Sequence, residues 1–169
     1  MRLERTSGNL GTSAVPCAKA SICRSFRAQI FHFLNSKLKT MKTKTLHQSV
    51  LLKATPHEVY EALIDSKKHT EFTHSPAVIR REVGAEFSAF DGWASGTTVE
   101  LIPDKKIVQK WRASDWPPGH YSTVTFELQA EGRDTRLDFT QADIPEDLYP
   151  DLKAGWVEYY WDNLTAYFG

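Results

Sequence analysis

Few residues in this sequence have the types and the spacing that metal sites or catalytic sites require. Of the six histidines, the nearest pair is His69 and His74, with Glu71 between them. Metal-binding pairs on one helix usually sit four positions apart, and these two are five apart, so the pair matches no known metal motif. Both cysteines, Cys17 and Cys23, lie near the N-terminus, which leaves the rest of the chain without a thiol for a disulfide, a zinc site or a nucleophile. We therefore expect no metal and no other cofactor, and we expect both histidines to be solvated loop residues.

Motifs for phosphate binding and for nucleophilic catalysis are missing from the sequence as well. Gly92 and Gly96 have the spacing of a hairpin turn, and no glycine-rich loop joins a strand to a helix. There is no Gly-x-Ser-x-Gly element and no Cys–His pair. These observations favour a protein that binds over one that catalyses.

Opposite charges are unevenly distributed along the chain. Residues 1–40 hold seven Lys or Arg and one acid, Glu4, whereas the remainder holds 14 basic and 20 acidic residues. Because residues 41–169 are acidic overall, we expect no cluster of basic residues there that could bind a nucleic-acid phosphate backbone, so nucleic-acid binding is disfavoured. The apolar segment at 30–34 is far shorter than the roughly 18 residues of a membrane span, so we do not expect an integral membrane protein.

The basic segment 1–40 allows three interpretations. It bears Arg and Ser, is nearly free of acids and is weakly amphipathic over 26–34, which is typical of a mitochondrial presequence. We favour a disordered tail or a start codon placed too far upstream, because Met41 opens a segment that begins a complete domain. The protein is accordingly expected in the cytoplasm, or in mitochondria if 1–40 is a presequence.

Residues 41–169 suit one domain that begins with a strand and a helix. Alternating apolar positions predict a strand over 44–54. The helix after it has a clear start: Thr55 stands at the N-cap, Pro56 at the first helical position and Glu58 three after the cap, which is a capping box. Apolar residues then follow with helical spacing, so one side of this helix packs against something apolar.

Turn signals divide the middle of the chain into short strand-like runs, which predicts an antiparallel meander. We expect strands over 77–83, 86–90, 97–102, 106–113, 121–130 and 135–142. Alternation is cleanest in the last two. There one set of apolar side chains shares a face of the sheet, namely Val124, Phe126, Leu128, Leu137 and Phe139.

A long helix is expected at the C-terminus, over 150–168, with Pro150 as its first residue and Asp151 in the first turn. Its apolar residues crowd one broad arc: Leu152, Trp156, Tyr159, Tyr160, Leu164 and Tyr167. Such a helix needs a large apolar partner, and a curved meander wrapped around it supplies one. The predicted class is therefore α+β, a curved antiparallel sheet around a long C-terminal helix.

Three stretches carry a resemblance to a known family: residues 86–93, residues 105–116, and Gly155-Trp156 with Tyr159-Tyr160-Trp161. Together they resemble the C-terminal domain of the activators of heat-shock protein 90 ATPase, within the START-like (birch-pollen-allergen, SRPBCC) superfamily. The resemblance covers residues 46–168. It implies a helix-grip fold with a cavity between the sheet and the long helix, and a chaperone of heat-shock protein 90 type as a partner.

The resemblance also bears on how the protein would work. In the full-length activators a separate N-terminal domain grips the middle segment of the chaperone, and residues 1–40 are too few for such a domain. Some distant members of the superfamily are cyclases, in which a buried acid such as Asp138 or Asp91 would serve as a base, although its strand pattern directs Asp138 outward. We keep a cyclase-like enzyme as the alternative to a non-catalytic binding domain.

A largely apolar cavity that holds a small hydrophobic ligand is our main functional hypothesis. Strand parity and helix angle select its candidate lining residues: Phe87, Val99, Leu101, Ile107, Gln109, Trp111, Phe126, Leu128, Phe139, Trp156, Tyr160 and Asn163. For any single one of these, plain core packing is the alternative. The two amides, Gln109 and Asn163, need partners if they are buried, and a ligand's polar end, water, each other or the backbone could supply them.

One loop stands apart, because Trp116 lies on the proline-rich stretch 115–120. A tryptophan on a stiff loop can anchor a protein partner, but large aromatic side chains more often fold back onto their own sheet. Both interpretations stay open, with Trp116 as the candidate partner contact. We expect the protein to be a monomer.

Overall fold

A single antiparallel sheet of six strands organises residues 41–169, the part of the chain that this computed structural model describes. The strands are β1 (Thr43–Leu52), β2 (Glu86–Ala89), β3 (Ala94–Ile102), β4 (Lys106–Ala113), β5 (Ser122–Glu131) and β6 (Asp134–Pro145). Their order across the sheet is β1-β6-β5-β4-β3-β2, so the first strand pairs with the last at one edge. The expectations for residues 1–40 lie outside the described residues.

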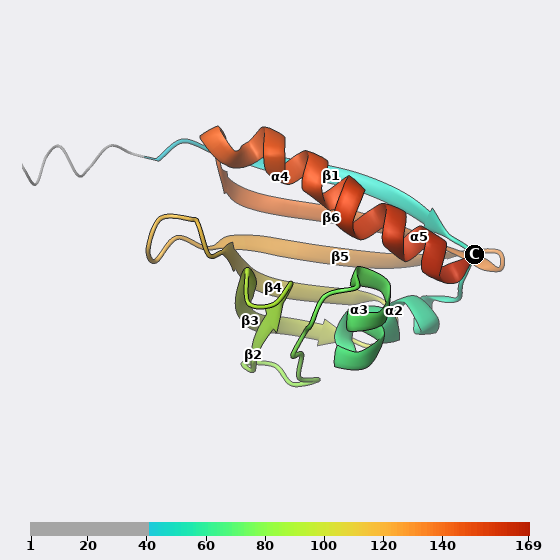
Figure 1. Ribbon diagram of the computed structural model, residues 1–169. Coiled ribbons are helices and arrows are strands. Elements are labelled where there is room, and N and C mark those ends of the chain that lie inside the picture. The colour runs from blue at the N-terminus through green and yellow to red at the C-terminus, as the bar shows by residue number, and fades with distance from the viewer. Residues whose placement is uncertain (1–40) are drawn as a thin grey trace, which may run out of the picture. The chain divides into compact units, whose positions relative to one another are not determined.

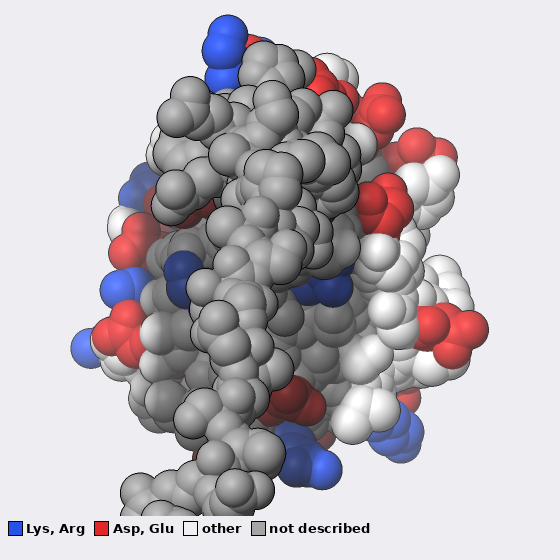
Figure 2. Space-filling model, turned by 90° about the vertical axis from the view of Figure 1, so that its left-hand side faces the viewer, with Lys and Arg blue, Asp and Glu red and all other residues white. Residues whose placement is uncertain are grey.

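The helices are α2 (Pro56–Ile64), α3 (Ser66–Thr73), α4 (Tyr149–Trp156) and α5 (Asp162–Phe168), with a 3-10 turn at Glu146–Leu148 and a π-helical segment at Val157–Trp161. Figure 1 shows α4 and α5 as one long helix lying across the sheet, whereas α2 and α3 lie together and α3 contacts α5. The predicted α+β arrangement is confirmed. Where described residues are visible in Figure 2, acidic and basic side chains are interspersed.

The start of α2 is the predicted capping box. The backbone N–H of Glu58 donates to the Thr55 hydroxyl over 3.3 Å, and the Thr55 N–H donates to the Glu58 carboxylate over 2.8 Å. The Thr55 N–H, followed by the Thr55 hydroxyl, which also donates to this carboxylate over 2.8 Å, holds the pKa of Glu58 below its usual value, because both bonds favour the ionised form. Two of the N–H groups that the helix start leaves without an intrahelical partner, those of Thr55 and Glu58, are therefore satisfied.

Two expectations for residues 65–83 are wrong. Helix α3 was not expected, although Asp65 marks its start by accepting from the N–H groups of Lys67 and Lys68 at 3.0 and 3.1 Å. Residues 77–83 form no strand beyond a single bridge to β2. The reason is that the Ile79 N–H donates 2.8 Å to the Ser66 hydroxyl of α3, so a helix side chain takes the place of a neighbouring strand.

The core lies between the sheet and the long helix. The five apolar residues predicted to share a face of β5 and β6 are all buried, and Phe126 pairs directly with Phe139 across the two strands. Their rings are 5.3 Å apart. The clean alternation of these two strands therefore identified the buried face correctly.

Strand β3 departs from simple alternation at two points. Its register with β4 shifts between Thr98 and Glu100, which turns Val99 outward to 45% exposure and buries Thr98. Gly96 lies within the strand and not in a hairpin turn, contrary to expectation. A Cβ there would lie 1.8 Å from the Lys110 carbonyl oxygen, so only glycine lets the two strands approach this closely.

The C-terminal helix is also not uniform. Between α4 and α5 it widens into the π-helical segment Val157–Trp161, which rotates the residues that follow relative to an ideal α-helix. As a result both Tyr160 and Trp161 are buried, whereas Tyr159 and Tyr167 are 57% and 39% exposed. Of the six residues predicted to form the apolar face of this helix, the four that are spaced four residues apart are buried: Leu152, Trp156, Tyr160 and Leu164.

Candidate ligand-binding pocket

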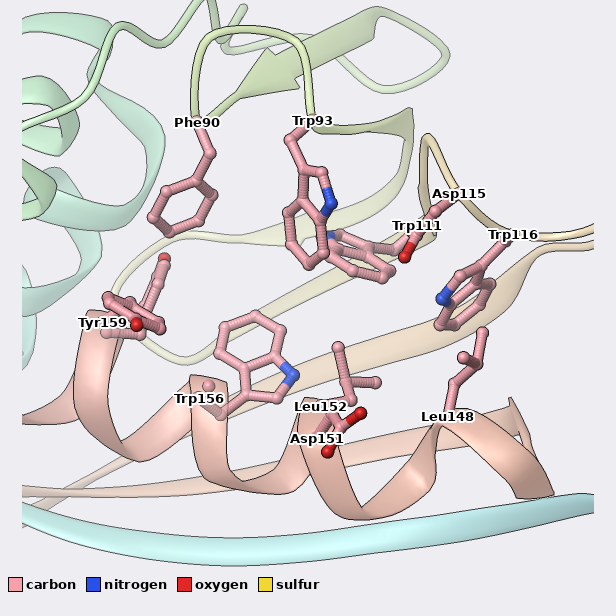
Figure 3. Close-up of a pocket in the computed structure, with 12 residues that line it drawn as sticks. Phe90, Trp93, Trp111, Asp115, Trp116, Leu148, Asp151, Leu152, Trp156 and Tyr159 are labelled. Atoms are coloured by element: carbon pink, nitrogen blue, oxygen red, sulfur yellow. The ribbon is translucent and has the colours of Figure 1, made fainter.

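An open pocket of about 370 Å³ lies between α4, strand β4 and two loops. We call it the outer pocket. Seven of its lining residues are aromatic: Phe90, Trp93, Trp111, Trp116, Trp156, Tyr159 and Tyr160. Figure 3 shows Phe90 and Trp93 entering from the β2–β3 turn, Trp116 from the β4–β5 loop and Trp156 from the helix, all directed at one space.

The β2–β3 turn places its aromatic side chains through an unusual backbone. Phe90, Asp91 and Gly92 all have positive φ, at 53°, 53° and 87°. A non-glycine aromatic residue in this region is uncommon and carries strain. The turn is held by the Asp91 N–H, which donates 3.1 Å to the Pro76 carbonyl. This turn places Phe90 and Trp93 at the pocket.

Buried hydrogen bonds fix the deeper wall. The Trp156 indole N–H donates 2.7 Å to Gln141, whose amide N–H donates 2.9 Å to the Ser122 hydroxyl. Ser122 in turn donates 3.0 Å to the carbonyl of Trp111. A chain of side chains across β6, β5 and β4 therefore sets the positions of two tryptophans, whose rings lie 6.1 Å apart.

Trp116 is folded back onto its own sheet and is only 4% exposed, which agrees with the second of the two interpretations. Its ring packs 5.2 Å from Trp111 and 5.6 Å from His120. Arg112 donates 2.9 Å to the Trp116 carbonyl, and the His120 ring lies 2.7 Å from the Asp143 carbonyl. The proline-rich loop is thus fastened to its own sheet and serves as a wall of the outer pocket.

Behind the outer pocket lies an inner cavity of about 20 Å³, enough for one water molecule. Phe90, Trp111, Trp156 and Tyr160 line both spaces. At its end the Tyr160 hydroxyl is 3.3 Å from His69 Nε2, while His69 Nδ1 has no partner among residues 41–169. Burial lowers the pKa of His69 to about 4 and raises that of Tyr160, so both are neutral at pH 7.

His69 corrects a prediction, because it is 4% exposed and not a solvated loop residue. Its ring packs on Phe72 and Tyr160, at centroid distances of 4.9 and 5.6 Å. His74 ends α3 with a left-handed φ of 54° and is exposed. The two histidines therefore do not converge. Within residues 41–169 no cluster of His, Cys, Asp or Glu is arranged to hold a metal ion.

Seven of the twelve predicted cavity residues surround the inner cavity: Phe87, Ile107, Gln109, Trp111, Phe126, Trp156 and Tyr160. Of the others, Leu128 and Phe139 are buried but line neither space, and Leu101 packs on the edge of the core. Two candidates are wrong for a physical reason. The strand bulge turns Val99 outward, and the amide of Asn163 donates 3.0 Å to the carbonyl of Tyr159 one turn back.

The sequence reasoning missed the residues that form the mouth of the outer pocket: Phe90, Trp93, Asp115, Leu148, Asp151, Leu152, Gly155 and Tyr159. Strand parity cannot assign them, because they lie in turns and on the flank of a helix. Two of the five tryptophans, Trp93 and Trp116, lie beside turn signals, and this was the available clue. A turn signal does not indicate which side chains meet.

The acids considered for a cyclase-like mechanism lie away from this pocket. Asp138 is on the outer face of β6, where it accepts 2.7 Å from Ser49 and 3.1 Å from Arg136. Asp91 is exposed at the tip of the β2–β3 turn. The carboxylates that do line the outer pocket, Asp115 and Asp151, are both exposed. The geometry supports binding better than proton transfer.

Comparison with known proteins identifies the fold and the family. Residues 53–169 match the family model described as activator of Hsp90 ATPase homolog 1-like protein. The human activator of 90 kDa heat shock protein ATPase homolog 1 is 33% identical over 133 residues, which is 79% of this chain and 38% of that relative. The chain thus spans less than half the length of the curated relatives it matches.

Solved structures agree with this assignment. An HSP90 activator from Plasmodium falciparum superposes with a TM-score of 0.69 at 27% identity, covering 72% of this chain and 94% of that one. The Aha1 dimer from Colwellia psychrerythraea has the same fold, with a TM-score of 0.62 at 20% identity over 75% of this chain and 99% of that one. None of the helices within residues 41–169 is long and apolar enough to cross a membrane. On the family match, the sequence identity and the shared fold, this chain belongs to the family of activator of Hsp90 ATPase homolog 1-like proteins.

Proposed function

We propose that residues 41–169 form a non-catalytic binding domain that associates with a chaperone of heat-shock protein 90 type. The observation that carries the proposal is the 33% identity to a named activator of that chaperone's ATPase over most of this domain. An activator of an ATPase must favour one chaperone state over another, which requires different contacts to the two states. The predicted role is therefore preferential binding to one nucleotide state.

The contact made by this one domain is expected to be weak. Linking a second binding domain raises avidity by about 100-fold to 10,000-fold, because the second contact becomes intramolecular. A domain that matches 38% of the human activator has only part of such a surface. We expect measurable binding to the chaperone and little stimulation of its ATPase at equimolar concentration.

Calorimetric titration of the purified chaperone, with and without a non-hydrolysable nucleotide, tests this proposal. The full-length human activator serves as the positive control, and the ATPase rate is measured in parallel. Weak binding that differs between nucleotide states supports the role. Absence of binding at concentrations where the control saturates would contradict the chaperone proposal, and strong stoichiometric activation would contradict the expected weakness.

A second candidate function is the binding of a small apolar molecule, and the outer pocket favours it. Ligand sites are typically concave, mostly apolar and about 300–1,000 Å³ in volume, and this pocket has about 370 Å³ with a largely aromatic lining. Its walls are fixed by the buried hydrogen bonds of Trp156 and the fastened loop of Trp116. A preformed site loses little entropy on binding.

A pair of helix substitutions tests pocket occupancy. Gly155 lines the outer pocket, and a Cβ there meets nothing closer than Tyr159 at 3.8 Å. Gly155→Leu adds a side chain at the pocket wall and should reduce binding of the uncharged dye Nile red to the native protein. The neighbouring Ala154 is exposed and outside the lining, so Ala154→Leu is the matched control. Equal dye binding by both variants would place the dye elsewhere.

A further inference from the structure

We infer that the outer pocket selects a ligand with a quaternary ammonium group. This inference rests on the proposed ligand-binding function and narrows its substrate class. The pocket combines an aromatic wall with two carboxylates, Asp115 and Asp151, and none of the side chains that line it is basic. A site of this composition favours a cation that is itself largely apolar.

The aromatic wall supplies the first part of the argument. The faces of aromatic rings carry negative electrostatic potential, and tryptophan attracts cations most strongly. Trp111 is the centre of the group, with Trp93 5.7 Å, Trp116 5.2 Å and Trp156 6.1 Å away. The first two contacts are edge-to-face, so these rings pack directly on one another and leave no room for a cation between them. A cation bound in the pocket lies against the wall that these rings form together.

The carboxylates supply the second part. Asp115 comes from the β4–β5 loop and Asp151 from the first turn of α4, and Figure 3 shows them among the aromatic side chains. The salt bridges found within residues 41–169 engage neither carboxylate. An acid in the first turn of a helix also stabilises the helix, which by itself explains Asp151. It does not explain why Asp115 borders the same space.

The type of cation follows from hydration and hydrogen bonding. A primary ammonium is a compact and strongly hydrated charge, and leaving water for an aromatic wall would cost it hydrogen bonds. A quaternary ammonium has no N–H donor and is covered by methyl or methylene groups, so it loses no such bonds. Aromatic cages are a known means of recognising it. The rest of the ligand would then occupy the apolar part of the pocket beside Leu148 and Leu152.

Two probes of the same shape isolate the charge. One is the trimethyl(2-phenylethyl)ammonium cation, and the other is (3,3-dimethylbutyl)benzene, in which carbon replaces the nitrogen. Both are titrated into the full chain at low salt, with tryptophan fluorescence as the readout. We expect the cation to bind at least tenfold more tightly than its neutral isostere. In the double variant Asp115→Asn/Asp151→Asn this preference should fall below threefold while affinity for the isostere stays unchanged.

The control is Asp162→Asn, because Asp162 is exposed on the same long helix and outside the pocket lining. It should keep the full preference for the cation. Equal affinity for the two probes in the wild type overturns the inference and leaves the apolar pocket standing. Failure of both probes to bind contradicts the pocket proposal itself. A double variant that retains the preference, or loses both probes together, overturns the role of the carboxylates.

Discussion

The long C-terminal helix covers two regions of the same sheet in opposite ways. Over β1 and β6 it forms a closed region, in which Trp156 and Trp161 stack at 5.4 Å and donate their indole N–H groups to Gln141 and Gln48 over 2.7 and 2.8 Å. Toward β2–β4 it borders the outer pocket, where Trp93 and Tyr159 stay 41% and 57% exposed. In the closed region an amide accepts from each indole N–H, and Trp156, which also lines the outer pocket, belongs to both regions.

The largest expected effect separates the two regions by stability. Phe139 is 1% exposed and packs 4.4 Å from Trp156, so Phe139→Ala should cost about 3–5 kcal/mol of unfolding free energy. Trp93→Ala at the pocket mouth should cost less than about 1 kcal/mol, because the ring is 41% exposed. Urea unfolding of both variants measures the difference. Similar losses would mean that the pocket wall is part of the core.

The next effect is the pH dependence contributed by His69, which lies behind the pocket. Burial holds its folded pKa near 4, below the ordinary value of 6.5. Between these values the unfolded chain binds a proton that the folded protein does not. Stability should therefore fall by about 3 kcal/mol as the pH drops from 6.5 to 4, since one pKa unit corresponds to about 1.4 kcal/mol.

Unfolding free energies measured at pH 7 and pH 4.5 check this contribution. In His69→Leu, most of the loss of unfolding free energy that is due to His69 should disappear, and the loss that is due to the carboxylates should remain. His74→Asn is the control, because His74 is exposed and asparagine tolerates its left-handed backbone. An unchanged pH dependence in His69→Leu would show that His69 takes up its proton without unfolding.

A third test compares two buried amides of the inner sheet face. Gln141 accepts from Trp156 and donates to Ser122, so Gln141→Leu should leave the buried Trp156 indole N–H without a partner and cost about 1–3 kcal/mol. Gln109 faces the inner cavity, and no hydrogen bond to its amide is seen within residues 41–169. Gln109→Leu should therefore change stability by less than about 1 kcal/mol. Thermal or urea unfolding that ranks the two variants in reverse would refute the division into closed and open regions.

The smallest expected effect on stability comes from α2, which lies outside both regions and serves as a reference for the other variants. Thr55→Ala removes one half of the capping box of α2 and should cost about 1 kcal/mol. Thr55→Ser keeps a hydroxyl at the N-cap and should restore most of the loss. Neither change should alter dye or cation binding. A binding change would indicate that α2 communicates with the pocket.

Local signals carried much of this prediction. The capping box at Thr55 and Glu58 requires neighbours three residues apart, and the alternation of β5 and β6 requires only that one face be buried. Both follow from short-range geometry, and both are confirmed. The same reasoning failed for Val99, because a bulge depends on how β3 meets β4, and for α3, whose eight residues have a weak apolar pattern but a clear Asp65 cap.

By itself, the sequence determined that residues 41–169 form an acidic α+β domain with an antiparallel meander and a long aromatic C-terminal helix, because periodicity, caps and turn residues are local properties. Only the tertiary structure decided which aromatic side chains meet. The π-helical segment at 157–161 changes the faces of the helix, and the left-handed turn at Phe90 brings a distant strand connection over it. A pocket is made by segments far apart in the chain, so no local pattern could specify which of its walls are closed and which are open.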